Sequence, residues 1–171
     1  NMTGDLDIKA ENISNVGKGD GTRFTVANAA VGVGNVGIGI GVNYISVTDK
    51  VTANANNVSV NSGSMSVTAD EKSSADAVTV NLAGGMFGSG DVNVVLPVLD
   101  SAVEASVTSD DGADVGITTT AGGLTVAANN EQWLRSHLWA FVLSFNPSGA
   151  SVSANICVNS INLAGTAEAR V

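Results

Sequence analysis

Apolar and polar residues alternate along most of the chain, and the clearest case is the segment 36–44. Its large apolar residues, Val36, Ile38, Ile40 and Val42, alternate with glycine. Because successive side chains of a strand point to opposite faces, this alternation predicts a strand with one apolar face and one nearly bare face. A helix would scatter the glycines around its circumference and lose about 1 kcal/mol at each one. A bare face lets another backbone approach closely, which favours stacked β-structure.

Three short segments share the order apolar, polar, apolar, polar, alanine, polar, and we call them the anchor strands. They begin at Leu6, Met65 and Leu124, so that both intervals between them are 59 residues. Equal intervals of this length indicate an internal repeat. The pattern predicts three units, spanning residues 1–57, 58–113 and 114–171, of which the third is atypical and rich in aromatic residues.

Each anchor strand is followed by two longer β-segments, and a turn rich in glycine, asparagine or proline joins the two. We interpret the two segments as an antiparallel hairpin, closed by short strands near residues 58–60 and 115–117, which lie 57 apart. The apolar residues are expected to point inward: Phe24, Val26, Ala30, Val36, Ile38, Ile40, Val42, Val78, Val80, Leu82, Val92, Val94, Leu96, Leu138, Ala140, Val142, Val152, Ala154 and Ile156. Since proline cannot donate to a central ladder, Pro97 is expected at an edge or a bulge.

A unit with one apolar face cannot bury that face alone, so neighbouring units must stack. The sequence therefore predicts an elongated all-β fold, either a β-solenoid or stacked β-hairpin repeats, in three units of about 59 residues. Exposed strand edges at the ends of such a stack recruit further strands. We accordingly expect self-association, or neighbouring repeats of a longer chain, as the main partner.

Composition narrows the classes of partner. The chain of 171 residues carries 16 acidic and 7 basic residues, a formal net charge of −9, which disfavours nucleic acid and anionic membranes. The uncharged segment 29–48 approaches the length of a membrane helix, but its glycine alternation favours strands, so no membrane insertion of this segment is expected. No charged-then-apolar leader stands at the N-terminus, and the chain reads as a mature form or a piece of a longer protein.

The densest carboxylate cluster contains Asp110, Asp111 and Asp114. Calcium takes six to eight oxygen ligands and is the cation such a cluster would hold. The spacing matches neither the EF-hand loop nor the nine-residue calcium-binding repeat. We therefore favour a solvated acidic turn, with Ca²⁺ as the alternative and no other cofactor.

A second candidate lies in the third unit, where Trp133, Arg135, His137, Trp139 and Phe141 fall at every second position. This spacing predicts that they share one strand face. Aromatic rings beside an arginine can stack on a sugar or on a partner protein. The alternative, which we favour, is that they cover the end of the stack or contact a neighbouring subunit, since end repeats are commonly atypical.

Signatures of catalysis are missing from the sequence. Cys157 is the only cysteine, which excludes an internal disulfide, and its place between Ile156 and Val158 predicts a buried, inert thiol. His137 is the only histidine, so a multi-histidine metal site within the chain is excluded. No Gly-x-Ser-x-Gly elbow occurs, and the few basic residues are scattered. We do not expect an enzyme; the alternative considered is a polysaccharide-cleaving β-helix.

The anchor pattern, the glycine-rich segment, the Val-Asn-x-Ile run and the closing Ala-x-Ala together resemble the repeats of very large bacterial surface adhesins. These are the filamentous-haemagglutinin-like and leukotoxin-like autotransporter proteins, whose passenger regions are long β-helices. The resemblance covers essentially the whole chain and departs at Pro97 and at 131–145. It implies an extracellular or cell-surface bacterial protein that forms a stalk or adhesive filament, with a glycan or host surface as the alternative ligand. It transfers no catalytic residue.

Overall fold

The computed structural model describes residues 4–16, 24–31, 36–110, 116–147 and 149–171. Every regular element in these ranges is a β-strand, which confirms the all-β prediction, and no helix there is long and apolar enough to cross a membrane. The strands are β1 (Leu6–Val16), β2 (Phe24–Val31), β3 (Val36–Asn56), β4 (Val60–Ser62), β5 (Met65–Gly85), β6 (Gly88–Thr108), β7 (Ile117–Thr119), β8 (Leu124–Ser144), β9 (Val152–Asn159) and β10 (Asn162–Arg170).

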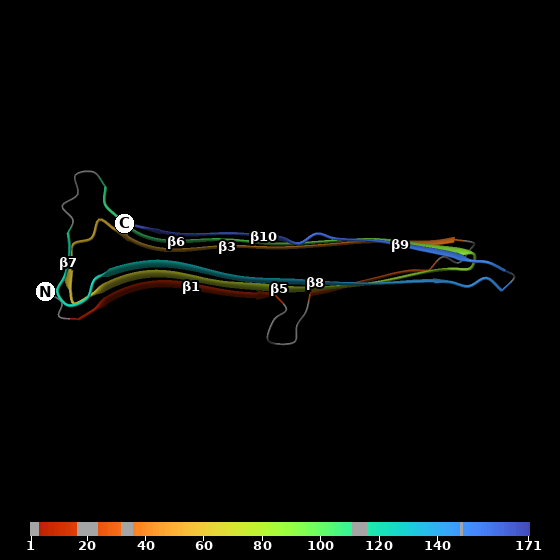
Figure 1. The fold of residues 1–171 in the computed structure, drawn as a ribbon, viewed down its shortest axis with the longest axis horizontal. Coiled ribbons are helices and arrows are strands. Elements are labelled where there is room, and N and C mark those ends of the chain that lie inside the picture. The colour runs from red at the N-terminus through yellow and green to blue at the C-terminus, as the bar shows by residue number, and fades with distance from the viewer. Residues whose placement is uncertain (1–3, 17–23, 32–35, 111–115, 148) are drawn as a thin grey trace.

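The strands form two long sheets and one short sheet. Sheet A contains β1, β2, β5 and β8, sheet B contains β3, β6, β9 and β10, and sheet C contains β4 and β7. All paired strands are parallel. The chain passes from sheet A to sheet B to sheet C and then returns to sheet A. Figure 1 shows sheets A and B as two facing layers, with β7 at the end that carries both termini.

The predicted antiparallel hairpins are wrong. Strands β5 and β6 follow one another along the chain but lie in different sheets, and each pairs with strands from other passes of the chain. The second anchor strand and the first hairpin segment of its unit are one continuous strand of 21 residues, β5. The turn at residues 86–87 reverses the chain both in a hairpin and between two facing sheets. The residues of the turn therefore do not distinguish the two arrangements. Matching patterns in successive passes make parallel pairing the better solution.

The anchor strands lie side by side in register, as their spacing predicts. Leu6 aligns with Met65, and Met65 aligns with Leu124, both at an offset of 59. The offset is 57 between β4 and β7, 52 between β3 and β6, and 64 between β6 and β9. Connections of different length account for these values: residues 145–151 join β8 to β9, whereas Met86 and Phe87 alone join β5 to β6. The connections absorb the length differences and the ladders stay in register.

We divide the two facing sheets into two halves along the strand direction. The short-sheet half lies next to sheet C and comprises residues 47–56, 65–75 and 99–108 with their neighbours in β1, β8 and β10. The turn half lies beside the β5–β6 connection and comprises residues 36–46, 76–85 and 88–98 with their neighbours in β2, β8 and β9. The main apolar core is in the short-sheet half and consists of Val51, Ala53, Ala55, Met65, Val67, Ala69, Val103, Ala105 and Val107.

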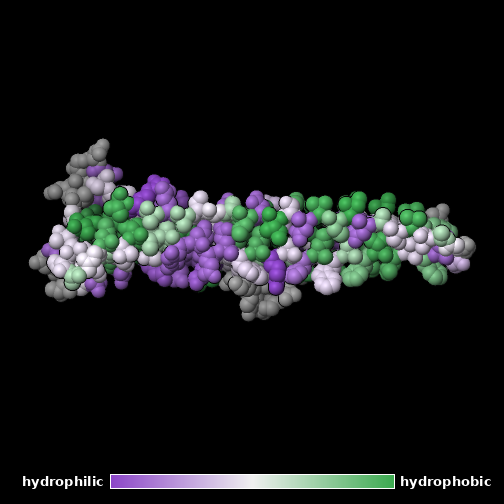
Figure 2. All heavy atoms as spheres, viewed as in Figure 1, coloured by the Kyte–Doolittle hydropathy of each residue, from purple (hydrophilic) through white to green (hydrophobic). Residues whose placement is uncertain are grey.

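In the turn half, the predicted inward and outward faces are reversed in β3, β5 and β6, but not in β8, where Leu138, Ala140 and Val142 align with buried Thr79, Asn81 and Ala83. Ile38 and Ile40 are 67% and 73% exposed, whereas Gly37, Gly39 and Gly41 between them are buried. The same reversal holds in β5 and β6, where the buried positions include Thr79, Asn81, Asp91 and Asn93 and the apolar residues lie outside. Figure 2 shows apolar surface along much of this half, whereas polar surface is densest left of the middle, in the short-sheet half.

Close approach of the two sheets explains the reversal. A Cβ added to Gly85 would lie 2.0 Å from the carbonyl oxygen of Gly88 and 2.6 Å from the backbone nitrogen of Gly37. The space between the layers near the turns is therefore too thin for Val or Ile. Next to the turn, glycine and small residues fill the interior and the larger apolar side chains point outward, whereas Ile45 and Val95 are buried further along the same strands.

Two further expectations need correction. Pro97 lies within β6, the central strand of sheet B, and not at an edge. However, β9 ends at Asn159 and β10 begins at Asn162, so the ladder on that side is interrupted opposite Pro97. Cys157 is exposed rather than buried. It lies on β9, which pairs with β6 along one edge and has no partner on its other edge among the described residues.

The molecule is elongated, but its long axis follows the strands (Figure 1). A strand of 21 residues such as β5 is about 70 Å long at roughly 3.3 Å per residue. Three strands at about 4.8 Å spacing occupy only about 10 Å between the first and the last. The length of the individual strands, and not the number of stacked passes, therefore sets the shape.

Candidate binding faces

The aromatic strand of the third pass is β8, and its alternation is as predicted. Leu134 points inward and packs against buried Ala75, Ala77 and Leu99. Trp139 and Phe141, on the opposite face, are 56% and 50% exposed. The inward Leu134 and the outward rings follow from strand geometry, because neighbouring residues point to opposite faces.

Arg135 is occupied by contacts within the protein. Its guanidinium forms an ion pair and hydrogen bond with buried Asp76, the residue aligned with it on β5, and it also lies 5.0 Å from the centre of the Trp133 ring. The hydrogen bond that Arg135 donates to Asp76 is the main cause of the raised pKa of Arg135. Trp133, Arg135 and His137 are each half-buried. Of the four residues predicted to bind a ligand, Trp139 alone presents a largely exposed ring.

Apolar residues that the sequence does not place beside the aromatic rings extend the exposed face. In the register of sheet A, Val80 aligns with Trp139 and Leu82 aligns with Phe141. Leu143, on the same face of β8, is 65% exposed. The sequence predicts Val80 and Leu82 inside a hairpin, and only the parallel register places them beside the rings. The result is an exposed apolar face on sheet A.

The predicted calcium ligands do not assemble into a site that the structure describes. Asp111 and Asp114 lie outside the described residues. Asp110 accepts a hydrogen bond from the Asn57 side-chain nitrogen at 2.6 Å, and its own backbone nitrogen donates to the Asn57 side-chain oxygen at 2.8 Å. Asn57 has a φ of 54°, so this reciprocal pair stabilises a left-handed corner before β4. Among the described residues, no three His, Cys, Asp or Glu side chains are placed to hold a metal ion.

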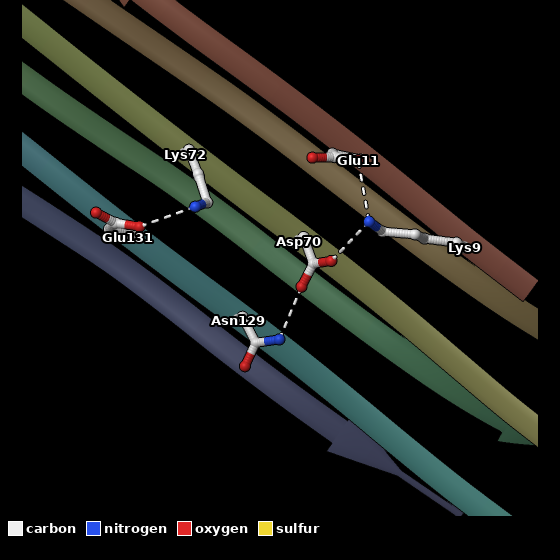
Figure 3. A network of polar contacts seen from close by, with 6 residues as sticks. All are labelled: Lys9, Glu11, Asp70, Lys72, Asn129 and Glu131. Atoms are coloured by element: carbon white, nitrogen blue, oxygen red, sulfur yellow. Dashed lines mark hydrogen bonds and ion pairs between the residues drawn. The ribbon is translucent and has the colours of Figure 1, made fainter.

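A polar network crosses the outer face of sheet A in the short-sheet half (Figure 3). Lys9 Nζ lies 3.0 Å from Glu11 and 3.4 Å from Asp70, and Asp70 accepts a hydrogen bond from Asn129 Nδ2 at 2.7 Å. The hydrogen bond from Asn129 is the main cause of the lowered pKa of Asp70, and the hydrogen bond to Glu11 is the main cause of the raised pKa of Lys9. These charges are paired along the surface and do not converge on a pocket.

A second polar group lies between the sheets. Glu71 is 1% exposed and accepts a hydrogen bond from Ser73, whose hydroxyl also lies 3.4 Å from Asp49. In the turn half, Asn43 Nδ2 donates to Thr79 Oγ1 at 2.7 Å, and both residues are buried. The alternation in the sequence places these polar residues on one face of each strand. Only the position of the opposite sheet shows that this face is the buried one. Buried in this way, these groups hold the sheets in place and are closed to a substrate.

Two hollows lie at the ends of elements. One, of about 260 Å³, is apolar and is lined by Val58, Val107, Thr108, Ser109, Gly116, Ile117 and Val171. The other, of about 440 Å³, lies between β8 and β10. Its polar groups are used internally, since Gln132 donates to the Ala164 carbonyl at 2.8 Å and Asn130 donates to the Thr166 carbonyl at 3.2 Å. Neither hollow joins a nucleophile to a base.

No protein-family model, no curated protein and no solved structure matches the chain. The arguments for its function therefore rest on its own sequence and geometry.

Proposed function

We propose that this chain is a structural segment of an extracellular bacterial surface protein, built as a β-solenoid of three stacked units that forms part of a stalk or filament. The observation that carries the proposal is the equal offset of 59 residues in two ladders of sheet A, from β1 to β5 and from β5 to β8. Side chains follow the same offset, as in the hydrogen bonds from Ser64 to Asp5 and from Ser66 to Asp7. Equivalent positions of successive passes therefore contact each other, which is how a solenoid is stabilised.

The end of such a stack explains how it would grow. Strand β8 is an edge strand of sheet A, and an unpaired strand edge is a template for a further strand. Each added pass extends the stack by about 4.8 Å. Because the strands are long, the resulting assembly is a broad ribbon rather than a thin rod. The partner is a further unit of a longer chain or a second copy.

The proposed location and the non-enzymatic role have separate support. The chain is poor in charged residues and rich in Asn, Ser and Thr, and the sequence resembles bacterial surface adhesins. The polar groups that the structure brings together are paired across the stack or buried between the sheets. Such groups act by holding the layers together, which suits a mechanical function.

A disulfide experiment tests the stacked register. Thr68 and Ala127 are aligned on the outer face of sheet A, so cysteines at both positions in a Cys157→Ser chain should form a disulfide on oxidation. The matched control places the second cysteine at Thr125, two residues away on the same strand and the same face, which lies too far from position 68. Bridging of the aligned pair alone supports the proposal. Equal bridging of both pairs, or of neither, contradicts it.

A charged residue introduced at the end of the stack tests whether further passes add there. Ala167 aligns with buried Val103 and is itself exposed, so a further pass would cover it. Ala167→Lys should leave the isolated chain folded and prevent end-to-end growth, because stacking would bury an unpaired charge. Thr166→Lys, on the outer face of the same strand, is the control. Electron microscopy and sedimentation velocity would measure assembly, and growth of Ala167→Lys equal to that of the parent chain would contradict end stacking.

A second function has one observation in its favour. The exposed rings of Trp139 and Phe141 lie beside Val80 and Leu82 on one open face, a surface on which a sugar ring can stack. A glycan array would test this adhesin role. Saturable binding that is lost in Trp139→Ala and kept in Thr125→Ala would support it, and binding that is unchanged in Trp139→Ala would contradict it.

A further inference from the structure

A polar layer interrupts the apolar interior between the two long sheets. It contains Glu71 and Ser73 on β5, Ser101 on β6 and Asp49 on β3. It separates the main apolar core from a second apolar cluster, which consists of Ile45, Val47, Ala75, Ala77 and Leu99. Glu71, Ser73 and Ser101 are at most 2% exposed, and Asp49 is half-buried. Because apolar side chains flank the polar layer on both sides, charges within it interact more strongly than they would in water.

The two carboxylates of the polar layer have one hydroxyl donor between them. Ser73 Oγ donates to Glu71 Oε1, and the same hydroxyl lies 3.4 Å from Asp49 Oδ2. A hydroxyl carries a single hydrogen, so it cannot satisfy both carboxylates. Glu71 Oε2 is buried and has no hydrogen-bond partner among the described residues. Since an unpaired buried carboxylate is costly, this pair needs a positive charge.

The lysines and arginines that the structure describes are engaged elsewhere. Four of them form ion pairs with other carboxylates: Lys9, Lys72, Arg135 and Arg170. Lys50 is exposed, and because it follows Asp49 directly on β3 its side chain points to the opposite face of the strand. Within the described part of the chain, therefore, no basic side chain neutralises Glu71 and Asp49.

The third pass completes the same layer in a different way, with amides. At the position equivalent to Glu71 it has Asn130, two residues further along it has Gln132, and at the position equivalent to Asp49 it has Gly165. Across the space left by Gly165, the two amide groups donate hydrogen bonds to backbone carbonyls of β10, at 3.2 and 2.8 Å. Between the first and second passes, carboxylates stand at these positions and supply no hydrogen. A cation is what would join the sheets there in place of the amide hydrogens.

We propose that Glu71 and Asp49 bind a calcium ion between the two sheets, at the junction of the first and second passes. The two carboxylates supply the two negative charges that Ca²⁺ requires for neutrality. Ser73 Oγ lies between them and is a third oxygen of the site. Asn12 and Ser14 are aligned with Glu71 and Ser73 on the inner face of β1, so they add oxygens at the same level. Water completes the six to eight oxygen ligands that calcium takes.

Calcium suits these ligands better than zinc or magnesium. Zinc prefers histidine and cysteine, and both His137 and Cys157 lie in the turn half. Magnesium demands a nearly ideal octahedron. Ligands drawn from two sheets and two passes form an irregular set, which the more flexible coordination of calcium accepts.

An ion can reach the site from one side of the stack. Asp49 and Asn12 are half-buried and lie on β3 and β1, which are edge strands of their sheets in this half. A single ion fits an opening that is closed to a larger substrate. The site lies within one chain, so this inference is independent of growth at the end of the stack.

Isothermal titration calorimetry of the full chain with calcium chloride, after metal removal on a chelating resin, tests the proposal. The parent should bind one ion. Glu71→Gln and Asp49→Asn each remove one charge and keep the shape of the side chain. Each should weaken calcium binding at least about tenfold, because affinity follows the number of charged ligands. Asp100→Asn removes an exposed carboxylate from the outer face of sheet B and should bind calcium as the parent does.

Thermal unfolding gives a second readout that does not measure binding directly. In EDTA, Glu71→Gln should unfold at a higher temperature than the parent, because it removes a buried unpaired charge. In saturating calcium the order should reverse, because the parent gains the free energy of ion binding. Circular dichroism would follow unfolding in both conditions and would show that each variant is folded.

Several outcomes would overturn the proposal. A parent that binds no calcium at millimolar concentration would do so, and so would an affinity that is unchanged in both Glu71→Gln and Asp49→Asn. Binding that is kept in Glu71→Gln but lost in an Asp111→Asn, Asp114→Asn double variant would assign the ion to the acidic turn. A parent stabilised by acid but not by calcium would show that a proton neutralises the pair. Equal affinity for magnesium would contradict the preference for calcium.

Discussion

The two halves of the long sheets have the same alternation but opposite interiors. In the short-sheet half, Met65 and Val67 are buried, and Lys9 and Asp70 lie on the outer face. In the turn half, most buried positions carry amide, hydroxyl or glycine residues and most Val and Ile side chains lie outside, with buried Ile45 and Val95 as exceptions. The comparison shows that alternation predicts a strand with two unlike faces, but it does not say which face is covered.

The residue types that point inward change along the length of a single strand. Burial alternates through almost the whole of β3, so no bulge shifts its phase. The inward positions are Gly39 and Gly41 near the turn, and Val51 and Ala53 further along. The backbone keeps its register, and the sequence changes the content of each face as the space between the sheets changes.

The largest predicted difference between the halves concerns truncation of an apolar side chain. Met65→Ala removes a side chain that is 1% exposed and should cost about 2–5 kcal/mol of unfolding free energy. Ile40→Ala removes one that is 73% exposed and should change the stability of the isolated chain by less than about 0.5 kcal/mol. Chemical denaturation would measure both. Equal losses would mean that Ile40 is covered in the isolated chain and that the two halves do not differ.

The second prediction compares glycines on the two faces of the turn half. Gly39→Val adds a side chain to the buried face and should cost about 1–3 kcal/mol through overpacking. Gly90→Val adds the same side chain to the open outer face and should have little effect on the monomer. Thermal unfolding at low protein concentration would compare them. A neutral Gly39→Val would show that the sheets are not in close contact there.

The third prediction concerns the buried hydrogen bond between Asn43 and Thr79. Thr79→Val leaves the Asn43 amide without its partner and should cost about 1–3 kcal/mol. The double variant Asn43→Val, Thr79→Val should lose less than the sum of the single variants, because no orphaned group remains. A double-mutant cycle by denaturant unfolding would measure the coupling. Additive losses of unfolding free energy would show that the two side chains do not interact.

The smallest expected effect is on the outer face of the short-sheet half and depends on pH. The pKa of Asp70 is lowered in the folded protein, chiefly because Asn129 donates a hydrogen bond to its carboxylate. The stabilisation is therefore present above the unfolded pKa of about 3.9 and is lost as the pH falls through the folded pKa. Asn129→Ala should make acid unfolding begin at a slightly higher pH. The same change in an Asp70→Asn chain should have no such effect, and a shift of equal size there would contradict the role of Asp70.

The exposed aromatic face of β8 could be predicted from the sequence, but the residues of other strands that join it could not. The alternation of Trp139 and Phe141 with inward residues followed from strand geometry alone. The addition of Val80 and Leu82 to that face required the parallel register, and the pairing of Arg135 with Asp76 required contact between residues 59 apart. The exposure of Cys157 depends on the absence of a partner along one edge of β9 in the described structure, which local sequence does not encode.

The sequence by itself determined that the chain forms strands and that its anchor strands align at 59 residues. Period-two alternation excludes helix, and equal spacing brings like residues side by side. Only the tertiary structure decided that successive long strands face each other instead of pairing, and that Gly39 points inward while Ile40 points outward. The physical reason is that a strand's pattern fixes the difference between its two faces. Which face is buried depends on the distance to the opposite sheet, and next to the β5–β6 turn that distance admits only small side chains.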